Sequence, residues 1–350
     1  MKQGKTIQEL AVELKRQAEA KKDFVANTQA LALVPVENGV QLEVGKNGQF
    51  PVNEHAHGQI AARLKIPKDY YDRMRTQQPG LLATNVNTWF QANPERRLIR
   101  TLDGRTRAFL SERYRRIDNI GLVQRILPRI RDYKGVELAS CEVTERKLYM
   151  KFVVSTMQAE IKVGDVVRAG FIMMNSEIGV GQADVSPFVD RLNCTNGMTL
   201  TEFGARRRHV GRIAESDEEA YELYSDRTLR ADDEAYYLKV VDTVNAVLQE
   251  EKFKLIVDSL KSATERKIQG DPREAVEVVS KRFGLNESEE SDFLKHLIEG
   301  GDLSAYGVAQ AITRTSQDVE NYDRASDLEK LGGDVITLGP SEWKVIANPN

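Results

Sequence analysis

The hydrophobic and polar positions of the first 93 residues repeat mostly with helical spacing. Apolar residues three or four apart predict helices over the segments 6–22, 54–64, 68–76 and 81–92. Thr6 is followed three residues later by Glu9, which is the pattern of a capping box at a helix start. Two short apolar runs around Asn38-Gly39 predict a β-hairpin over 31–44. We therefore expect residues 1–93 to form a mostly helical N-terminal region.

After residue 94 the pattern changes to the spacing of strands. Two apolar runs, 98–102 and 106–110, flank Asp103-Gly104 and predict a second hairpin. A helix is expected over 119–133, and Pro128 inside it should bend it or end it early. Alternating or continuous apolar runs predict further strands over the segments 136–143, 147–154, 166–175 and 181–192. We expect residues 94–213 to form an arginine-rich antiparallel sheet core.

From residue 214 onward the pattern is helical again and rich in acidic residues. Helices are expected over the segments 218–224, 232–258, 273–283, 287–297, 305–315 and 318–331. Glycines at the ends of several of these segments are typical helix stops, and a short strand is expected over 335–338. The predicted fold is therefore α+β. It has a central antiparallel sheet with helices packed on one face, plus a mostly helical acidic C-terminal region over 214–350.

The net charge of −3 conceals a strong division along the chain. Residues 1–213 contain 34 Lys and Arg against 23 Asp and Glu, a net charge of +11. Residues 214–350 contain 16 Lys and Arg against 30 Asp and Glu, a net charge of −14. This division favours a polyanion-binding part joined to an acidic part. The alternative is that the two halves attract each other or that the charge is divided by chance.

The positive charge is concentrated further between Pro94 and Arg131. This stretch holds eleven arginines and no lysine, against four acidic residues. The planar guanidinium pairs bidentately with phosphate and also stacks on bases. Phe109 and Tyr114 lie among the arginines, and aromatic rings between cations suit single-stranded nucleic acid. The alternative is a solvated basic surface with some internal ion pairs.

A second basic segment, Gly204 to Arg212, contains four arginines and His209 between glycines. Glycines let the backbone approach a phosphate closely, although the segment is equally compatible with an exposed basic linker. We give His209 no catalytic role. The residues expected to bind nucleic acid are Arg97, Arg100, Arg105, Arg107, Arg113, Tyr114, Arg115, Arg116, Arg206, Arg207, Arg208, His209 and Arg212.

No motif for catalysis, a metal or a cofactor stands out. Cys194 is a conceivable nucleophile, but a buried cysteine is the more common role of such a residue. The glycine-bearing stretch 175–181 lacks a phosphate-loop lysine and the dinucleotide spacing. Four acidic residues between 165 and 190 have no metal-ligand spacing and are expected at turns and on the surface: Asp165, Glu177, Asp184 and Asp190. We expect no cofactor, no metal and no catalytic residue.

Composition also bears on the compartment of the protein. Two cysteines indicate a reducing compartment rather than a disulfide framework. The first 22 residues lack the apolar core of a signal peptide, and no apolar run is long enough to span a membrane. We therefore expect a cytoplasmic protein.

Several segments together resemble a family of phage/plasmid-like proteins, the domain of unknown function 932. They are RTLDGRTRAFLSERYRRIDN (100–119), GDVVRAGFIMMNSEIGVG (164–181), RLNCTNGM (191–198) and RRHVGR (207–212). The chain departs from the family at Asn193, where a small apolar residue is expected before the cysteine. The resemblance extends over nearly the whole chain and implies a phage, prophage or plasmid setting inside a bacterial host. It brings no settled activity and no catalytic residues.

This setting favours one function among three. Phages commonly encode proteins that bind and anneal single-stranded DNA as rings or filaments. We expect a homo-oligomer that binds single-stranded DNA and supports annealing, recombination or replication. The alternative is an anti-defence or regulatory protein that binds a host or phage protein through its acidic helical half. A third possibility is an enzyme acting on nucleic acid or nucleotides with Cys194, His209 or an acidic cluster.

Overall fold

The computed structural model describes residues 1–37, 39–114, 116–181, 183–192, 196–201, 205–207 and 226–349. Three features predicted from the sequence lie outside these residues: Arg115, Cys194 and the segment 208–225, which includes the end of the second basic segment and a predicted helix. None of the described helices is long and apolar enough to cross a membrane.

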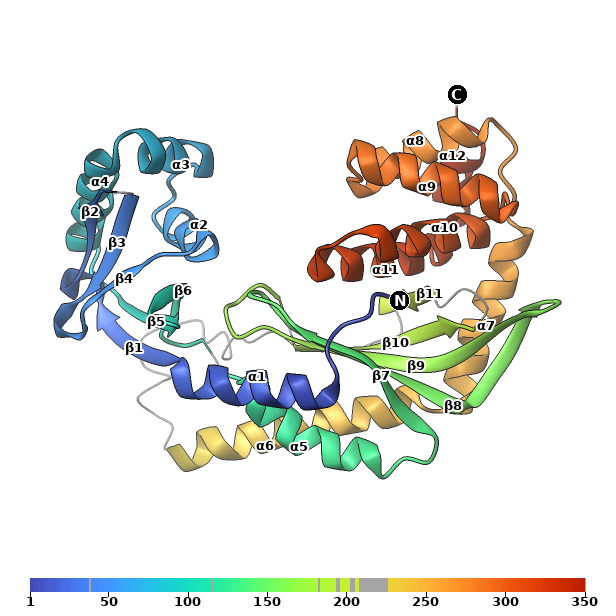
Figure 1. Cartoon of the computed structure of the whole chain (residues 1–350), viewed down its shortest axis with the longest axis horizontal. Coiled ribbons are helices and arrows are strands. Elements are labelled where there is room, and N and C mark those ends of the chain that lie inside the picture. The colour runs from blue at the N-terminus through green and yellow to red at the C-terminus, as the bar shows by residue number, and fades with distance from the viewer. Residues whose placement is uncertain are drawn as a thin grey trace.

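An antiparallel sheet lies at the centre of the molecule (Figure 1). Its described strands run in the order β11-β10-β9-β8-β7, with β12 also paired to β10. The strands are β7 (Val136–Val143), β8 (Leu148–Lys162), β9 (Asp165–Asn175), β10 (Ala183–Arg191), β11 (Asn196–Thr199) and β12 (Ala205–Arg207). The four strands predicted between 136 and 192 are confirmed. β8 is longer than predicted because its second half continues as a hairpin with β9.

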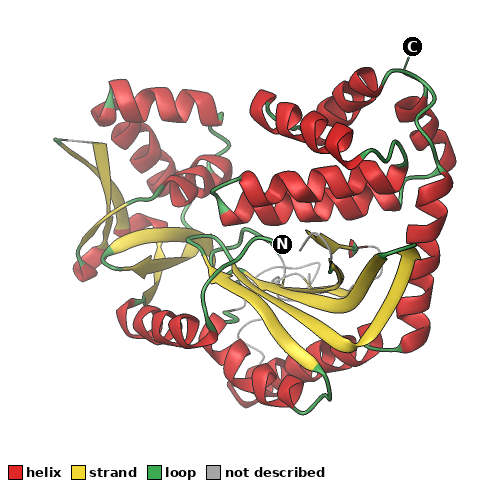
Figure 2. Cartoon of the chain, turned by 45° about the vertical axis from the view of Figure 1, so that its right-hand side comes forward, coloured by secondary structure: helices red, strands yellow, loops and turns green. Residues whose placement is uncertain are grey.

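Helices cover both faces of the central sheet (Figure 2). On one face, three helices bury Cys141, Phe152 and Phe171 of the sheet. These helices are α1 (Ile7–Ala20), α5 (Asn119–Arg131) and α6 (Asp226–Val247). On the other face, a C-terminal helix packs on Tyr149 and Ile172 through Tyr322. The C-terminal helices also pack around Val167 and Val189, which lie on the first face beyond Phe171. They are α7 (Glu250–Glu265), α8 (Pro272–Phe283), α9 (Glu287–Gly300), α10 (Ala305–Asp318), α11 (Tyr322–Ile336) and α12 (Pro340–Ala347). The α+β class and the helical C-terminal region are confirmed, and a second helical layer adds to the predicted one.

The N-terminal lobe combines two small sheets with three helices. One sheet has the order β1-β5-β6 and the other the order β2-β3-β4. The strands are β1 (Lys22–Asn27), β2 (Leu31–Val36), β3 (Gly39–Val44), β4 (Gln49–Pro51), β5 (Arg96–Leu102) and β6 (Arg105–Ser111). The helices α2 (Glu54–Arg63), α3 (Lys68–Gln77) and α4 (Pro79–Ala92) pack on them around Tyr71 and Phe90. Asp103 and Gly104 have φ angles of 51° and 72°, as a two-residue Asp-Gly hairpin turn requires. Both predicted hairpins are confirmed.

Some predicted elements are wrong. The helix predicted over 232–258 is two helices, because α6 ends at Val247 and α7 begins at Glu250. The strand predicted over 335–338 is not formed, since α11 continues to Ile336. The α5 helix continues past Pro128 to Arg131. β1 and β4 were not predicted, and β5 pairs with β1 and β6 in a separate sheet rather than with the central sheet.

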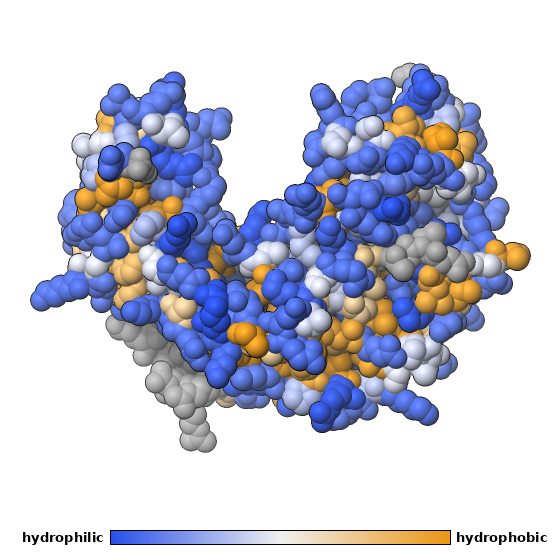
Figure 3. All heavy atoms as spheres, in the orientation of Figure 1, coloured by the Kyte–Doolittle hydropathy of each residue, from blue (hydrophilic) through white to orange (hydrophobic). Residues whose placement is uncertain are grey.

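The N-terminal lobe and the C-terminal helices stand on opposite sides of a cleft, with the central sheet beneath it (Figures 1 and 3). The space-filling view shows mainly hydrophilic residues on both walls (Figure 3). The helices α1, α5 and α6 lie on the opposite side of the sheet from this cleft (Figure 1). The arginine-rich segment of the sequence therefore runs from the N-terminal lobe, through β5 and β6, to the helical layer under the sheet.

Candidate nucleic-acid interface

The arginine-rich segment is held where the sheet β1-β5-β6 meets α5 and the loop 176–181. Arg100 lies at the centre of this junction and is 0% exposed. Its Nε is 2.9 Å from Asp23 Oδ1, its Nη2 is 2.6 Å from Asp118 Oδ1, and its Nη1 donates to the Glu177 carbonyl at 2.9 Å. The donor groups of this guanidinium are thus engaged inside the chain, so Arg100 does not face a ligand in this structure.

Arg107 and Arg97 are also used inside the chain. Arg107 is 7% exposed and forms an ion pair with the buried carboxylate of Glu177. The other oxygen of that carboxylate accepts the backbone N–H of Asn119 at 2.7 Å. Arg97 is 7% exposed, lies 2.9 Å from Glu95 and covers the ring of Phe109. We therefore remove Arg97, Arg100 and Arg107 from the set of residues that contact nucleic acid, because burial leaves them no open surface.

The ionisation of this junction follows from its charges. Burial alone would raise the pKa of the Asp118 carboxyl. The neighbouring cations Arg100 and Lys21 outweigh that effect and hold the pKa of Asp118 below its usual range. Lys21 Nζ lies 2.6 Å from Asp118 Oδ2, which ties the end of α1 to the start of α5. The junction is therefore a network of fixed charges that joins the N-terminal lobe to the sheet core.

Four cations surround the network and are exposed to solvent: Arg16, Lys22, Arg105 and Arg116. We call this set the junction surface. Arg16 Nη1 lies 2.7 Å from Asp103 Oδ1, which places the end of α1 beside the turn that precedes Arg105. Lys22 is opposite Thr101 in the β1–β5 pair, close to the same turn. Arg116 lies 3.8 Å from Asp23, a carboxylate of the same network. The side chains of Arg16 and Arg116 are 46% and 44% exposed, and Arg16 also donates to the Glu13 carboxylate through Nε and Nη2.

The structure describes only some of the remaining residues that were predicted to bind nucleic acid. Arg113 and Tyr114 are half-buried in the connection between β6 and α5, and Tyr114 donates its hydroxyl to the Ser176 carbonyl at 2.8 Å. The backbone of Arg206 and Arg207 belongs to β12, opposite Asp184 and Ala183 of β10. Arg115, Arg208, His209 and Arg212 lie outside the described residues. The structure thus brings Arg105 and Arg116 together with two cations that the prediction did not include.

Arg16 and Lys22 were missed because glutamates alternate with the cations in the first helix. The sequence signal was the repeated basic pair, Lys15-Arg16 and Lys21-Lys22. The helix α5 extends the same basic character, since it contains Arg125, Arg129 and Arg131 and no acidic residue. All three are exposed, and Arg125 also pairs with Glu234 of α6 at 3.0 Å. A basic strip therefore continues from the junction surface along α5, which packs beside α1.

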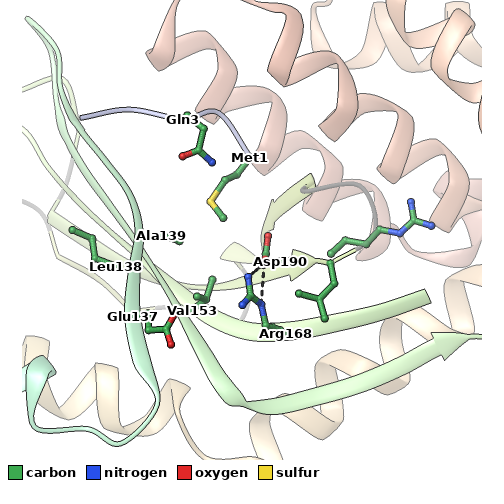
Figure 4. Close-up of a pocket in the computed structure, with 10 residues that line it drawn as sticks. Met1, Gln3, Glu137, Leu138, Ala139, Val153, Arg168 and Asp190 are labelled. Carbon is green, nitrogen blue, oxygen red and sulfur yellow. Dashed lines mark hydrogen bonds and ion pairs between the residues drawn. The ribbon is translucent and has the colours of Figure 1, made fainter. Parts of the chain in front are cut away.

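A separate cavity of about 270 Å³ opens on the face of the central sheet that the N-terminal segment crosses (Figure 4). Its lining includes Met1, Glu137 and Val153. Arg168 and Asp190 also line it, but their side chains form an ion pair at 2.5 Å (Figure 4). These opposite charges neutralise each other across neighbouring strands, so this pair presents little net charge to a ligand.

The acidic residues considered as metal ligands serve the fold instead. Asp165 pairs with Arg191 and accepts the hydroxyl of Tyr306, while Asp184 accepts the hydroxyl of Ser186. No group of three His, Cys, Asp or Glu side chains in the described part of the chain is arranged to hold a metal ion. Cys141 is buried, and burial raises the pKa of its thiol to about 11, so it is a poor nucleophile near neutral pH.

The fold and the junction define a class: an α+β protein with a central antiparallel sheet between two helical layers and a partly exposed arginine surface beside an internal ion network. A family model described as "Domain of unknown function (DUF932)" matches residues 108–333. The match covers well over half of the chain, so the protein belongs to this family. The expected family is thereby confirmed. No curated protein and no solved structure matches the chain.

Proposed function

We propose that this protein binds nucleic acid, specifically single-stranded DNA, on the junction surface and the adjoining arginines of α5. The observation that carries the proposal is the gathering of exposed cations from three separate segments around one turn. Arg16 comes from α1, Lys22 from β1 and Arg105 from β6. Residues far apart in sequence thus form one positive surface, as phosphate binding requires.

Arginine is the suitable residue type for this ligand. Each exposed guanidinium presents a planar set of donors that matches two phosphate oxygens. Their acidic partners hold Arg16 and Arg116 in place while nearly half of each side chain stays exposed. A fixed fork loses less side-chain freedom when it binds a phosphate than a mobile lysine does. The surface is therefore preorganised for a chain of phosphates.

The setting of the proposal is the cytoplasm of a bacterial host, where a phage or plasmid element would use the protein in annealing, recombination or replication. In this proposal the protein acts as a homo-oligomer, so that the surfaces of several copies form a continuous track. Membership of the family is compatible with this role and assigns none of its own.

The test is a salt titration of binding to a labelled oligo-dT strand, followed by fluorescence anisotropy. The double variant Arg105→Glu/Arg116→Glu reverses two charges of the junction surface. Each lost phosphate contact on a single strand lowers the slope of log K against log salt by roughly 0.7, so the slope should become shallower by about 1.4. Affinity at low salt should fall as well.

The matched control is Lys254→Glu/Lys261→Glu on α7, which makes the same charge change at two exposed lysines of the C-terminal helices. We expect this control to keep the wild-type slope and most of the affinity. Absence of binding at low salt would overturn the proposal. An equal loss of affinity in both double variants would show that net charge, rather than the junction surface, determines binding.

A further inference from the structure

The aromatic side chains near the basic surface are turned into the fold. Phe109 is 3% exposed and stacks on Phe90 with ring centroids 5.7 Å apart. Arg97 covers Phe109 at 5.4 Å. Although the sequence places this ring among the arginines, no face of it is open to a base.

Tyr114 is engaged in the same way. Its side chain packs against the apolar cluster that contains Leu110 and Ile178, and its hydroxyl is bonded to the Ser176 carbonyl. On α6, Tyr237 is 5% exposed, and the guanidinium of Arg125 lies 4.6 Å from the centre of its ring. These three rings therefore serve internal packing and are not stacking platforms. Tyr133, two residues after Arg131, is half-buried, and its hydroxyl donates to the Asn245 side chain.

The exposed aromatic residues lie elsewhere. Among the described residues, the large exposed rings are Tyr70 of α3 and Trp89 of α4. These helices form the part of the N-terminal lobe that is remote from α1 and α5 (Figure 1). A strand bound along the basic strip would meet guanidinium and ammonium groups, but no exposed ring of the described residues.

We infer that the junction surface and the basic strip hold single-stranded DNA by its sugar-phosphate backbone and leave the bases free. The inference rests on the proposed function and specifies its mode of recognition. Phosphate contacts fix the strand without reading its sequence, because every nucleotide presents the same phosphate. Bases that are not stacked on protein remain open to a complementary strand. This mode of binding is what annealing requires, since pairing would otherwise have to break contacts between bases and protein.

The test compares oligo-dT with an abasic strand of the same length and charge. A single stacked base strengthens binding by roughly 5- to 150-fold, so removing bases is a sensitive probe. We expect the two strands to bind within about twofold of each other and to show the same salt slope. A fivefold or larger loss for the abasic strand would overturn the inference while leaving DNA binding intact. If neither strand binds, the proposed function fails, and this inference fails with it.

A second measurement uses the exposed tryptophan. Trp343 is 5% exposed, so Trp89 is the tryptophan that a bound base could reach. We expect tryptophan fluorescence to stay within a few per cent of its starting value at saturation with oligo-dT, and Trp89→Leu to keep the wild-type affinity. Strong quenching together with a fivefold loss in Trp89→Leu would place the bases on α4 and overturn the inference.

Discussion

Arg100 shows how neighbours decide the role of an arginine. Its side chain is among the largest fully buried in the described structure, yet its sequence neighbourhood resembles that of the exposed Arg105. The difference lies in Asp23 and Glu177, each 77 positions away in the chain. A buried guanidinium is stabilised only when such partners satisfy it, and here two carboxylates and a carbonyl do so.

Replacing Arg100 by Met should therefore act on stability. The change leaves Asp23 and Asp118 without their shared cation, and breaking a buried ion network costs about 3–5 kcal/mol. Urea unfolding at neutral pH measures this loss. Arg105→Met, at an exposed position, should stay within about 0.5 kcal/mol of the wild type. Equal stability of the two variants would contradict the structural role of Arg100.

His57 makes the stability of the N-terminal lobe depend on pH. It is 4% exposed, and its Nδ1 lies 2.9 Å from the hydroxyl of Tyr71. Burial lowers the pKa of this imidazole to about 4 in the folded chain, against 6.5 for an unperturbed histidine. Below pH 6.5 the unfolded chain binds a proton that the folded chain does not. The contribution of His57 to the free energy of unfolding is therefore fully present above pH 6.5 and is lost as the pH falls toward 4.

We expect the free energy of unfolding to fall by up to roughly 3 kcal/mol between pH 6.5 and pH 4 on account of His57. The variant His57→Gln has no titrating group at this position, so its stability should vary less across the same interval. Urea unfolding at several pH values compares the two proteins. Parallel pH profiles would show that other groups cause the decline.

At the residue scale, the sequence alone identifies where the arginines lie but not which of them are exposed. Arg105 follows a turn whose Asp-Gly pair is visible in the sequence, and it is exposed as predicted. Arg97, Arg100 and Arg107 alternate with apolar residues in strands that are buried on both faces. Their acidic partners could not be identified from the sequence, because burial depends on how β1 and the loop 176–181 pack against those strands.

The loop 176–181 is the element that links the N-terminal lobe to the sheet core. Glu177 forms an ion pair with Arg107 and accepts a hydrogen bond from the backbone N–H of Asn119. The carbonyl of Ile178 lies 2.9 Å from His55 Nε2 and accepts the side-chain amide of Gln59 at 2.8 Å. Because α2, β6 and α5 all bind this one loop, its glycines serve a close approach between elements rather than a nucleotide.

Glu177→Gln should weaken this link. The neutral amide loses the ion pair with Arg107 and supplies only one acceptor oxygen, so we expect a loss of about 2–4 kcal/mol. Hydrogen–deuterium exchange should rise in β5, β6 and the loop 176–181 and remain unchanged in α8 and α9. The matched control is Glu145→Gln at the exposed β7–β8 turn, which should alter neither region. If exchange rose equally in α8 and α9, the result would contradict the view that Glu177 links elements locally.

Lys151 of β8 and Glu329 of α11 form a second buried contact between elements. Both side chains are 0% exposed, and the two charged groups lie 2.5 Å apart. Burial alone would lower the pKa of Lys151, but the charge of Glu329 outweighs it and raises that pKa. The pair links α11 to the sheet through opposite charges, and Glu329 also accepts the backbone N–H of Lys2 at 3.1 Å.

Removing one partner of this pair should cost more than removing both. Lys151→Met leaves the Glu329 carboxylate buried without its cation, and we expect a loss of about 3–5 kcal/mol. The double variant Lys151→Met/Glu329→Leu should recover most of that loss, because two apolar side chains of similar size can pack in the same space. A double-mutant cycle by urea unfolding measures the coupling. Additive losses would show that the two charges do not interact.

At the element scale, periodicity predicts most helices and the strands of the central sheet well. It fails where an element depends on a distant partner. β1 mixes charged and apolar residues and forms a strand because β5, about seventy residues later, supplies its hydrogen bonds. The break between α6 and α7 at 248–249 is also not visible in the apolar spacing, since the helical pattern continues through it.

At the scale of the whole molecule, the charge is divided along the chain. Residues 1–213 carry a net charge of +11 and residues 214–350 a net charge of −14. The helices α1 and α5, which contain Arg16 and the three arginines of the basic strip, lie on the side of the sheet opposite the C-terminal helices α8 to α12 (Figure 1). Surfaces of opposite charge favour a contact between the basic surface of one copy and the acidic C-terminal helices of the next. Such a contact between unlike surfaces produces rings or filaments.

If the homo-oligomer forms in this way, its size should depend on salt. We expect light scattering after gel filtration to give a larger mass at low ionic strength and a smaller one near 1 M salt, where the screening length shrinks to about 3 Å. Arg105→Glu/Arg116→Glu should reduce the mass at low salt. Lys254→Glu/Lys261→Glu should not, because it makes the acidic half more negative. Oligo-dT should compete for the same basic surface and shift the mass distribution at constant salt. An oligomer of constant size from low to high salt would instead indicate an apolar interface, and a monomer under all conditions would remove the homo-oligomer from the proposed function.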